Sequence, residues 1–190
     1  LLTIAYRGSH YAGWQIQPGK DTIQQRLETA LHELIGLTIR VHGSGRTDTG
    51  VHASAQCAHF DVPRDVNMGP ENWLAALNTR LPRDIRVMQC REVELDFHAR
   101  FSATSKHYRY SIWNDSILPP RQLDWSWHLP RQLDLRSMQW ASEQLPGEHD
   151  FAHLCARRGN EPSPLPSDYF KRRLIAAQLH RKGPELILDL

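Results

Sequence analysis

The chain has 190 residues, of which 40% are hydrophobic and 23% are charged, and its formal net charge is +2. This composition is that of a folded globular protein and excludes a disordered tail, and the length allows one large domain or two small ones. No apolar run approaches the roughly 18 residues that cross a bilayer. The three scattered cysteines indicate reduced thiols, so we expect a cytoplasmic protein with no membrane partner.

The first half of the chain predicts an α+β fold with the order strand, helix, strand, strand, helix, strand. Apolar residues at helical spacing predict a helix over 22–35, which begins with a capping box at Thr22 and Gln25 and ends at Gly36. The other elements expected are a helix over 70–81 and strands over 2–6, 38–42, 54–60 and 84–91. This is the split ferredoxin-like order, which RNA-recognition domains also use and which alone says little about function.

The second half is expected to cover residues 99–190, after a first half of residues 1–98. Alternation over 104–113 predicts a strand with Tyr108 and Tyr110 on one face and Arg109 on the other. The further elements expected are an irregular crossover over 117–132, a helix over 133–145, a proline-rich loop over 160–168 and strands over 170–180 and 185–190. Apolar runs at both ends predict that the chain is a fragment with a truncated second half.

Residues 43–53, Gly-Ser-Gly-Arg-Thr-Asp-Thr-Gly-Val-His-Ala, form a glycine-rich loop with one carboxylate, that of Asp48. Glycine lets a backbone turn sharply or approach a ligand closely. The cation of Arg46, two residues earlier, favours the ionised form of the acid. The loop is therefore a candidate site for a nucleophilic aspartate. The alternative interpretation is a polar turn whose Asp and Thr side chains bond the local backbone.

Positive charge is concentrated in the second half. Residues 98–110 hold three cations and no acid. Residues 151–182 hold seven cations and two acids: Arg157, Arg158, Lys171, Arg172, Arg173, Arg181 and Lys182 against Glu161 and Asp168. A solvated charged face is one interpretation, but the interleaved tyrosines favour a nucleic-acid partner.

Four sequence blocks carry a family resemblance. Residues 6–18 read Tyr-Arg-Gly-Ser-His-Tyr-Ala-Gly-Trp-Gln-Ile-Gln-Pro, residues 45–53 read Gly-Arg-Thr-Asp-Thr-Gly-Val-His-Ala, and residues 97–110 run from Phe-His-Ala-Arg-Phe to Tyr-Arg-Tyr. With Gly-Glu-His-Asp-Phe at 147–151, these blocks resemble the TruA family of tRNA pseudouridine synthases in order and spacing. The resemblance covers essentially the whole chain, and Gly-Arg-Thr-Asp is its most specific part.

The resemblance implies two ferredoxin-like halves that form a mainly antiparallel sheet, and isomerisation of uridine to pseudouridine at positions 38 to 40 of the tRNA anticodon stem-loop. Asp48 corresponds to the family's essential aspartate. Arg46 corresponds to an arginine that helps to displace the target base, and Tyr108 to the tyrosine that stacks on the flipped uracil. Whether the aspartate attacks C1′, attacks C6 or takes the C2′ proton stays open. The partners implied are tRNA and a second copy in a homodimer, with no DNA.

The isomerisation changes no redox state and transfers no group, so we expect no cofactor and no metal. It needs one carboxylate at the sugar–base junction and a dry pocket for the detached base. One alternative is a non-catalytic RNA-binding module of the same fold. Another is a metal hydrolase that uses His149 and His153, whose i, i+4 spacing would place them on one helix face, although no third ligand is evident.

Overall fold

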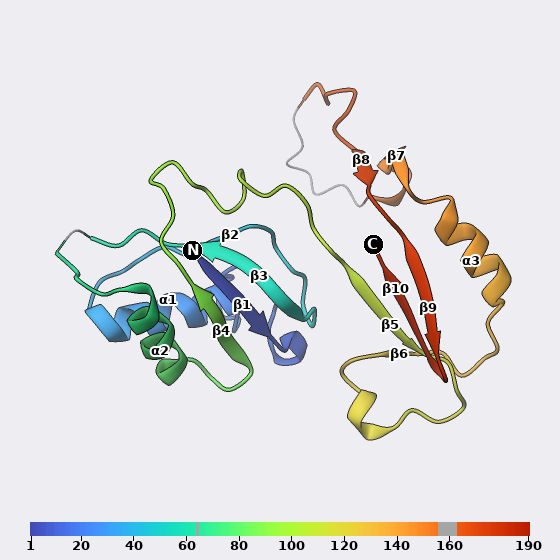
Figure 1. The fold of residues 1–190 in the computed structure, drawn as a ribbon, viewed down its shortest axis with the longest axis horizontal. Coiled ribbons are helices and arrows are strands. Elements are labelled where there is room, and N and C mark those ends of the chain that lie inside the picture. The colour runs from blue at the N-terminus through green and yellow to red at the C-terminus, as the bar shows by residue number, and fades with distance from the viewer. Residues whose placement is uncertain (64, 156–162) are drawn as a thin grey trace. The chain divides into compact units, whose positions relative to one another are not determined.

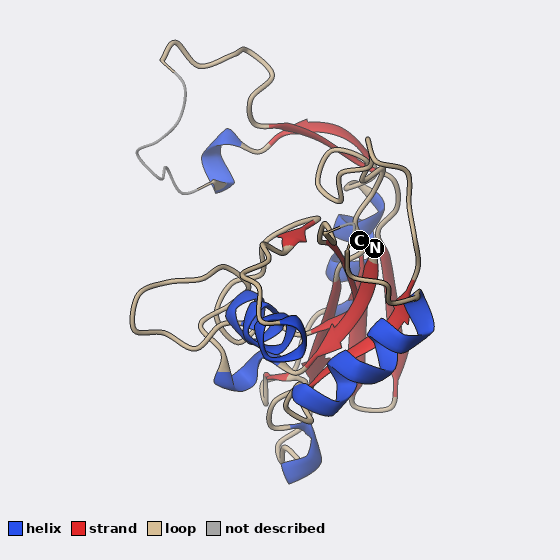
Figure 2. Ribbon diagram, turned by 90° about the vertical axis from the view of Figure 1, so that its left-hand side faces the viewer, coloured by secondary structure: helices blue, strands red, loops and turns tan. Residues whose placement is uncertain are grey.

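The computed structural model describes residues 1–63, 65–155 and 163–190. The chain forms two compact units, Leu1–Ser105 and Lys106–Leu190 (Figure 1). Both units combine helices with mainly antiparallel strands, which confirms the α+β class (Figure 2). Within the described ranges, none of the helices has the length and apolar character that a membrane crossing requires.

The first unit is a four-stranded sheet with two helices. Its elements are β1 (Leu2–Tyr6), a 3₁₀ turn (Gly8–His10), α1 (Ile23–Ile35), β2 (His42–Gly43), β3 (Ala53–His59), α2 (Pro70–Arg80) and β4 (Ile85–Cys90) (Figure 1). The strands lie in the order β2-β3-β1-β4, and each neighbouring pair is antiparallel. The element order and the strand order match the split ferredoxin-like arrangement expected for the first half.

The core of this unit joins one face of the sheet to the two helices. Along β1, Leu2, Ile4 and Tyr6 are buried and the residues between them are half-buried, so alternate side chains point into the core. The helices contribute the buried side chains Ile23, Leu27, Ala30 and Leu31 of α1 and Trp73 and Leu77 of α2. Burial of one large apolar side chain contributes about 1.5–3 kcal/mol. The core therefore fixes β1 and α1 firmly.

Helix α1 begins and ends where the sequence predicts. The Thr22 hydroxyl accepts the Gln25 N–H at 3.4 Å, which is one half of a capping box. Gly36 takes a left-handed φ of 72° at the other end, and its N–H donates to the His32 carbonyl oxygen.

The strand expected over 38–42 is wrong, because only His42–Gly43 pairs with a neighbouring strand. Side chains of α1 bind the backbone of Val41 instead. The Val41 carbonyl oxygen accepts from Gln24 Nε2, and its N–H donates to Glu28 Oε1, both at 3.0 Å. The Gln24 and Glu28 side chains therefore bind the backbone N–H and carbonyl oxygen of Val41, which a neighbouring strand would otherwise bind.

The second unit contains a four-stranded sheet, a helix and a separate two-stranded ladder. Its elements are β5 (Arg109–Trp113), a 3₁₀ turn (Pro120–Gln122), β6 (Trp127–His128), α3 (Leu135–Glu143), β7 (Gly147–Asp150), a 3₁₀ turn (Ala152–Leu154), β8 (Lys171–Leu174), β9 (Gln178–Lys182) and β10 (Glu185–Asp189). The larger sheet has the order β6-β5-β10-β9, and β7 pairs with β8. Only the β5–β6 pair is parallel among the described strands. In the described part of the chain, the second unit therefore contains two separate sheets.

Two predicted elements of this unit are shorter than their patterns indicate. The strand expected over 104–113 is Arg109–Trp113, and the helix expected over 133–145 is Leu135–Glu143. Asp134 sets the start of the helix, because its carboxylate accepts two backbone N–H groups of the first turn.

The strand expected over 170–180 is two strands. β8 pairs with β7 whereas β9 pairs with β10, so the chain changes sheets between them. The crossover expected over 117–132 also contains β6, which the sequence did not indicate. Residues 160–162 of the expected proline-rich loop lie outside the described residues, as do Arg157, Arg158 and Glu161 of the cationic stretch.

Candidate active site

The loop that carries Asp48 joins β2 to β3. It leaves the sheet where the Ser44 N–H donates to the Cys57 carbonyl oxygen at 2.8 Å, and it returns at the start of β3. Arg46 and Asp48 are both exposed. The loop therefore carries both the predicted carboxylate and the predicted cation and presents both to solvent.

The chain that follows β1 lies directly against this loop. A Cβ on Gly8 would overlap the Val51 carbonyl oxygen and lie 2.6 Å from the carbonyl carbon. Gly13 has a φ of +87°, and a Cβ there would lie 3.1 Å from the Asp48 carbonyl carbon. Both positions require glycine, because the two backbones are in contact.

Hydrogen bonds hold the residue before Asp48 at two atoms. The Trp14 N–H donates to the Thr47 carbonyl oxygen at 3.0 Å, and the Tyr6 hydroxyl lies 2.9 Å from Thr47 Oγ1. On the other side of the carboxylate, the Val51 N–H donates to the Asp48 carbonyl oxygen at 3.2 Å. The backbone is thus held on both sides of an exposed side chain.

Helix α1 is linked to the loop through the same residues. Its first two N–H groups, those of Ile23 and Gln24, donate to the carbonyl oxygens of Gly13 and Trp14 at 3.2 and 3.0 Å. The first four N–H groups of a helix have no partner inside it, so these bonds satisfy two of them. Trp14 therefore accepts from the helix with its carbonyl oxygen and donates to the loop with its N–H.

Three histidine rings of the first unit pack together. The His59 ring centroid lies 5.1 Å from that of His42 and 4.7 Å from that of His98, and His98 lies 4.5 Å from Phe101. The Ala99 N–H donates to His59 Nδ1 at 3.2 Å, which requires that nitrogen to carry no proton. Burial, with His98 and His42 nearby, lowers the pKa of His59 below its usual 6.5. These contacts tie the chain after β4 to the sheet.

Tyr108 belongs to the second unit, where it comes directly before β5. Its N–H and carbonyl oxygen exchange 2.9 Å hydrogen bonds with Leu190, so it continues the pairing of β5 with β10. Its side chain is 54% exposed, and that of Tyr110, two residues along, is 56% exposed. Arg109 projects from the opposite face, where Asp189 accepts two hydrogen bonds from it at 2.7 and 2.8 Å. Both tyrosine rings are accessible to a stacking partner.

Two of the predicted cations lie opposite acidic residues in a strand pair. In the β7–β8 ladder, Lys171 lies opposite Asp150 and Arg173 lies opposite Glu148. Opposite charges at directly paired positions contribute roughly 0.2–1 kcal/mol. These two cations therefore already have an anionic neighbour, which weakens the case for them as phosphate contacts.

The metal-hydrolase alternative fails on geometry. His149 lies in β7 and His153 lies in the 3₁₀ turn Ala152–Leu154, so they do not share a helix face. Among the residues that the structure describes, no group of three or more His, Cys, Asp or Glu side chains is placed to hold a metal ion.

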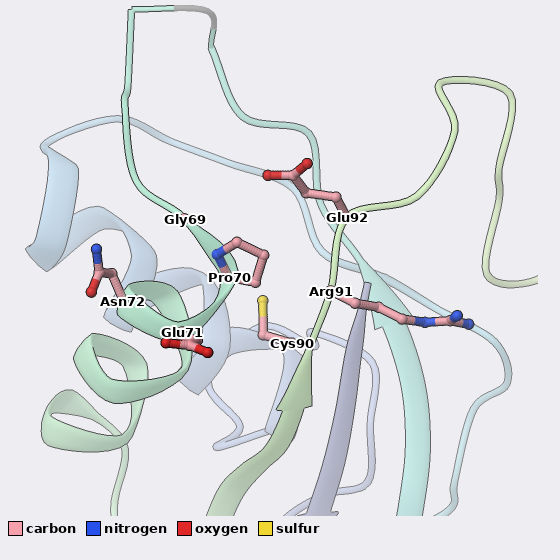
Figure 3. A pocket seen from close by; sticks show the side chains of 7 residues that line it. All are labelled: Gly69, Pro70, Glu71, Asn72, Cys90, Arg91 and Glu92. Atoms are coloured by element: carbon pink, nitrogen blue, oxygen red, sulfur yellow. The ribbon is translucent and has the colours of Figure 1, made fainter.

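Two shallow cavities lie in the first unit. One, between the start of α2 and the end of β4, is lined by Gly69, Pro70, Glu71, Asn72, Cys90, Arg91 and Glu92 (Figure 3). The other is lined by residues 37–40, 42 and 61–63. Neither includes Asp48 or Arg46, so neither is the dry pocket expected beside Asp48.

Sequence reasoning missed the residues that hold the loop, namely Tyr6, Gly13, Trp14 and Thr47. All four fall within the blocks that resemble a family, but the sequence did not indicate that they contact one another. The glycines were the available signal, because glycine indicates a close backbone approach without naming the partner.

Comparison with known proteins gives a consistent result. Residues 2–102 match a family model described as tRNA pseudouridine synthase. A tRNA pseudouridine synthase A of Akkermansia muciniphila is 46% identical over 187 residues, which cover 98% of this chain and 71% of the relative. Proteins of the same name from Halalkalibacterium halodurans and Methylococcus capsulatus are 40% and 42% identical; the matches cover 100% of this chain and 69% and 67% of the relatives.

The contact between Gly43 and Trp14 generates a stability prediction. A Cβ on Gly43 would lie 2.7 Å from two atoms of the Trp14 ring, and that ring is only 3% exposed, so it has little room to move. Gly43→Ala should lower the free energy of unfolding by about 1–3 kcal/mol. Gly69→Ala is the control, because nothing lies within 4 Å of the added Cβ. Urea denaturation measures both, and equal losses would contradict the packing argument.

The lowered pKa of His59 predicts how the stability of the protein depends on pH. Its folded pKa is lowered, so the unfolded chain binds the proton more readily, and stability is lost as the pH falls below 6.5. The free energy of unfolding should therefore be lower at pH 5.5 than at pH 7.5. His59→Asn keeps an acceptor for the Ala99 N–H but does not titrate, so its pH dependence should be shallower. An unchanged dependence in this variant would assign the effect to other groups, including His52, whose pKa burial also lowers.

Proposed function

Because this chain belongs to the TruA family of tRNA pseudouridine synthases, we propose that it isomerises uridine in tRNA with Asp48 as the catalytic carboxylate. The reaction exchanges the N1–C1′ bond of uridine for a C5–C1′ bond. The C5 hydrogen leaves as a proton and N1 gains one, so no net oxidation or reduction occurs. Three routes stay open: the carboxylate attacks C1′, attacks C6 or takes the C2′ proton. Each route requires the carboxylate to reach the sugar–base junction.

One observation carries this assignment. Asp48 is the sole acid between residues 43 and 53, its side chain is exposed, and the backbone on each side of it is hydrogen-bonded. A reacting group works best when its position is fixed before the substrate arrives. A carboxylate on a held loop meets that requirement and remains accessible to a nucleotide.

Arg46 and Tyr108 are proposed as substrate-binding residues. Arg46 is exposed on the same loop as Asp48, where a guanidinium can take the place of the target base or bind a phosphate. Tyr108 presents an exposed ring that can stack on the everted uracil, and stacking of this kind contributes about 1–3 kcal/mol per base.

We propose the anticodon stem-loop, at positions 38 to 40, as the target region of the tRNA. We further propose a homodimer in the cytoplasm, built from chains with two ferredoxin-like halves over residues 1–98 and 99–190. The relatives' name supports tRNA as the substrate, and the strand order β2-β3-β1-β4 supports the ferredoxin-like first half. The anticodon positions, the homodimer and the compartment are what the family resemblance implies.

Replacement of the carboxylate tests the assignment. Asp48→Asn should lower kcat for pseudouridine formation at least about 100-fold, because an amide is neither a nucleophile nor a base at neutral pH. Affinity for tRNA should change by less than about threefold, since the amide keeps the size of the side chain. Asp96→Asn, at another exposed carboxylate of the same unit, should keep wild-type kcat. An active Asp48→Asn refutes the proposal.

The stacking role of Tyr108 has its own test. Tyr108→Ala should lower kcat/KM about 5- to 150-fold, which corresponds to loss of about 1–3 kcal/mol of stacking. Tyr108→Phe keeps the ring face and should stay within about threefold of the wild type. Trp140→Ala, which removes an exposed ring from α3, should leave kcat/KM unchanged. If Tyr108→Phe is as poor as Tyr108→Ala, the hydroxyl and not the ring is responsible.

A further inference from the structure

The hydrogen bond between Tyr6 and Thr47 joins residues 41 positions apart, and the chemistry assigned to Asp48 does not by itself require it. Tyr6 is the last residue of β1 and is 4% exposed. Its backbone pairs with Ala53 of β3 on one side and with Ile85 of β4 on the other. The sheet therefore sets the position of the Tyr6 hydroxyl.

The pairing of β1 with β3 is irregular at this point. Ile4 pairs with Gln56 whereas Tyr6 pairs with Ala53, so two steps along β1 match three steps along β3. The extra residue makes a β-bulge where β3 emerges from the Asp48 loop. Bulges redirect side chains and occur often beside active sites.

The surroundings of Tyr6 favour a protonated hydroxyl. The ring packs against Trp14, with centroids 6.2 Å apart, and burial raises the pKa of Tyr6. The hydroxyl can therefore donate to Thr47 Oγ1 throughout the neutral pH range. A buried hydroxyl without a partner is unfavourable, so the bond stabilises the loop in the position observed.

We propose that Tyr6 is a positioning residue for Asp48, acting through Thr47. The Tyr6 hydroxyl holds the Thr47 side chain and the Trp14 N–H holds the Thr47 carbonyl oxygen, so the peptide that leads into Asp48 has one orientation. The carboxylate then keeps its direction towards the substrate. This inference rests on the catalytic role proposed for Asp48. Misplacement of a reacting group by about 1 Å can slow a reaction about 100-fold.

Removal of either hydroxyl tests the proposal. Tyr6→Phe and Thr47→Val should each lower kcat about 5- to 50-fold, measured as tritium release from tRNA labelled with [5-³H]uridine, with KM for tRNA within about twofold of the wild type. The double variant should be no slower than the slower single variant, because both changes remove one bond. Thr47→Ser keeps the hydroxyl and should stay within about threefold of the wild type.

Tyr11→Phe is the matched control. Tyr11 is 5% exposed and its hydroxyl donates to Asp84 Oδ1 at 2.7 Å, so this variant loses a buried hydroxyl bond in the same unit that does not reach Thr47. We expect it to lower the melting temperature at least as much as Tyr6→Phe does, with kcat within about twofold of the wild type.

Four results would overturn the positioning role: wild-type kcat in Tyr6→Phe, wild-type kcat in Thr47→Val, a Thr47→Ser variant as slow as Thr47→Val, or a loss that appears in KM alone. The Thr47 variants decide the question if Tyr6→Phe does not fold. Asp48→Asn separates this proposal from the catalytic assignment. If Asp48→Asn is inactive and Tyr6→Phe is fully active, only the positioning role fails; if Asp48→Asn is active, both fail.

Discussion

Two stretches of backbone meet with no side chain between them, and the candidate site depends on that contact. Gly8 lies against Val51 and Gly13 against Thr47, at separations that leave no room for a Cβ. Main-chain donors can therefore reach across, as the Trp14 N–H does. Fixing one loop residue costs about 1–2 kcal/mol of conformational entropy, whereas a typical hydrogen bond contributes about 0.5–1.5 kcal/mol. Several anchors are needed to hold one short loop, and the glycines make them possible.

The anchors form a connected series from the core to the carboxylate. Buried side chains of α1 fix the helix in the core, and its first N–H groups bind Gly13 and Trp14. Trp14 then binds Thr47, the residue before Asp48. A catalytic carboxylate has to be reached by its substrate, so it cannot be buried by its own chain. An exposed side chain on a restrained backbone is both accessible and ordered, because main-chain contacts hold the backbone in place.

Features set by neighbouring residues could be predicted from the sequence, and features set by distant residues could not. Thr22 and Gly36 mark the ends of α1 because capping is local. The alternation over 38–42 is also local, but it could not show that helix side chains bind the backbone of Val41. The pattern over 170–180 is continuous, yet its two parts have different strand partners. Pairing is a property of the tertiary structure, and no local pattern specifies it.

In the candidate site, too, local features could be predicted from the sequence and long-range contacts could not. The Asp48 loop is evident from its glycines and its one acid, whereas the Tyr6–Thr47 bond could not be foreseen across 41 residues. The loop contacts described above all lie within Leu1–Ser105, so this unit by itself orders the backbone around Asp48. Eversion of a nucleotide costs a few kcal/mol, which tRNA binding must supply. A loop that is already ordered draws nothing from that binding energy, which leaves it available for eversion of the base.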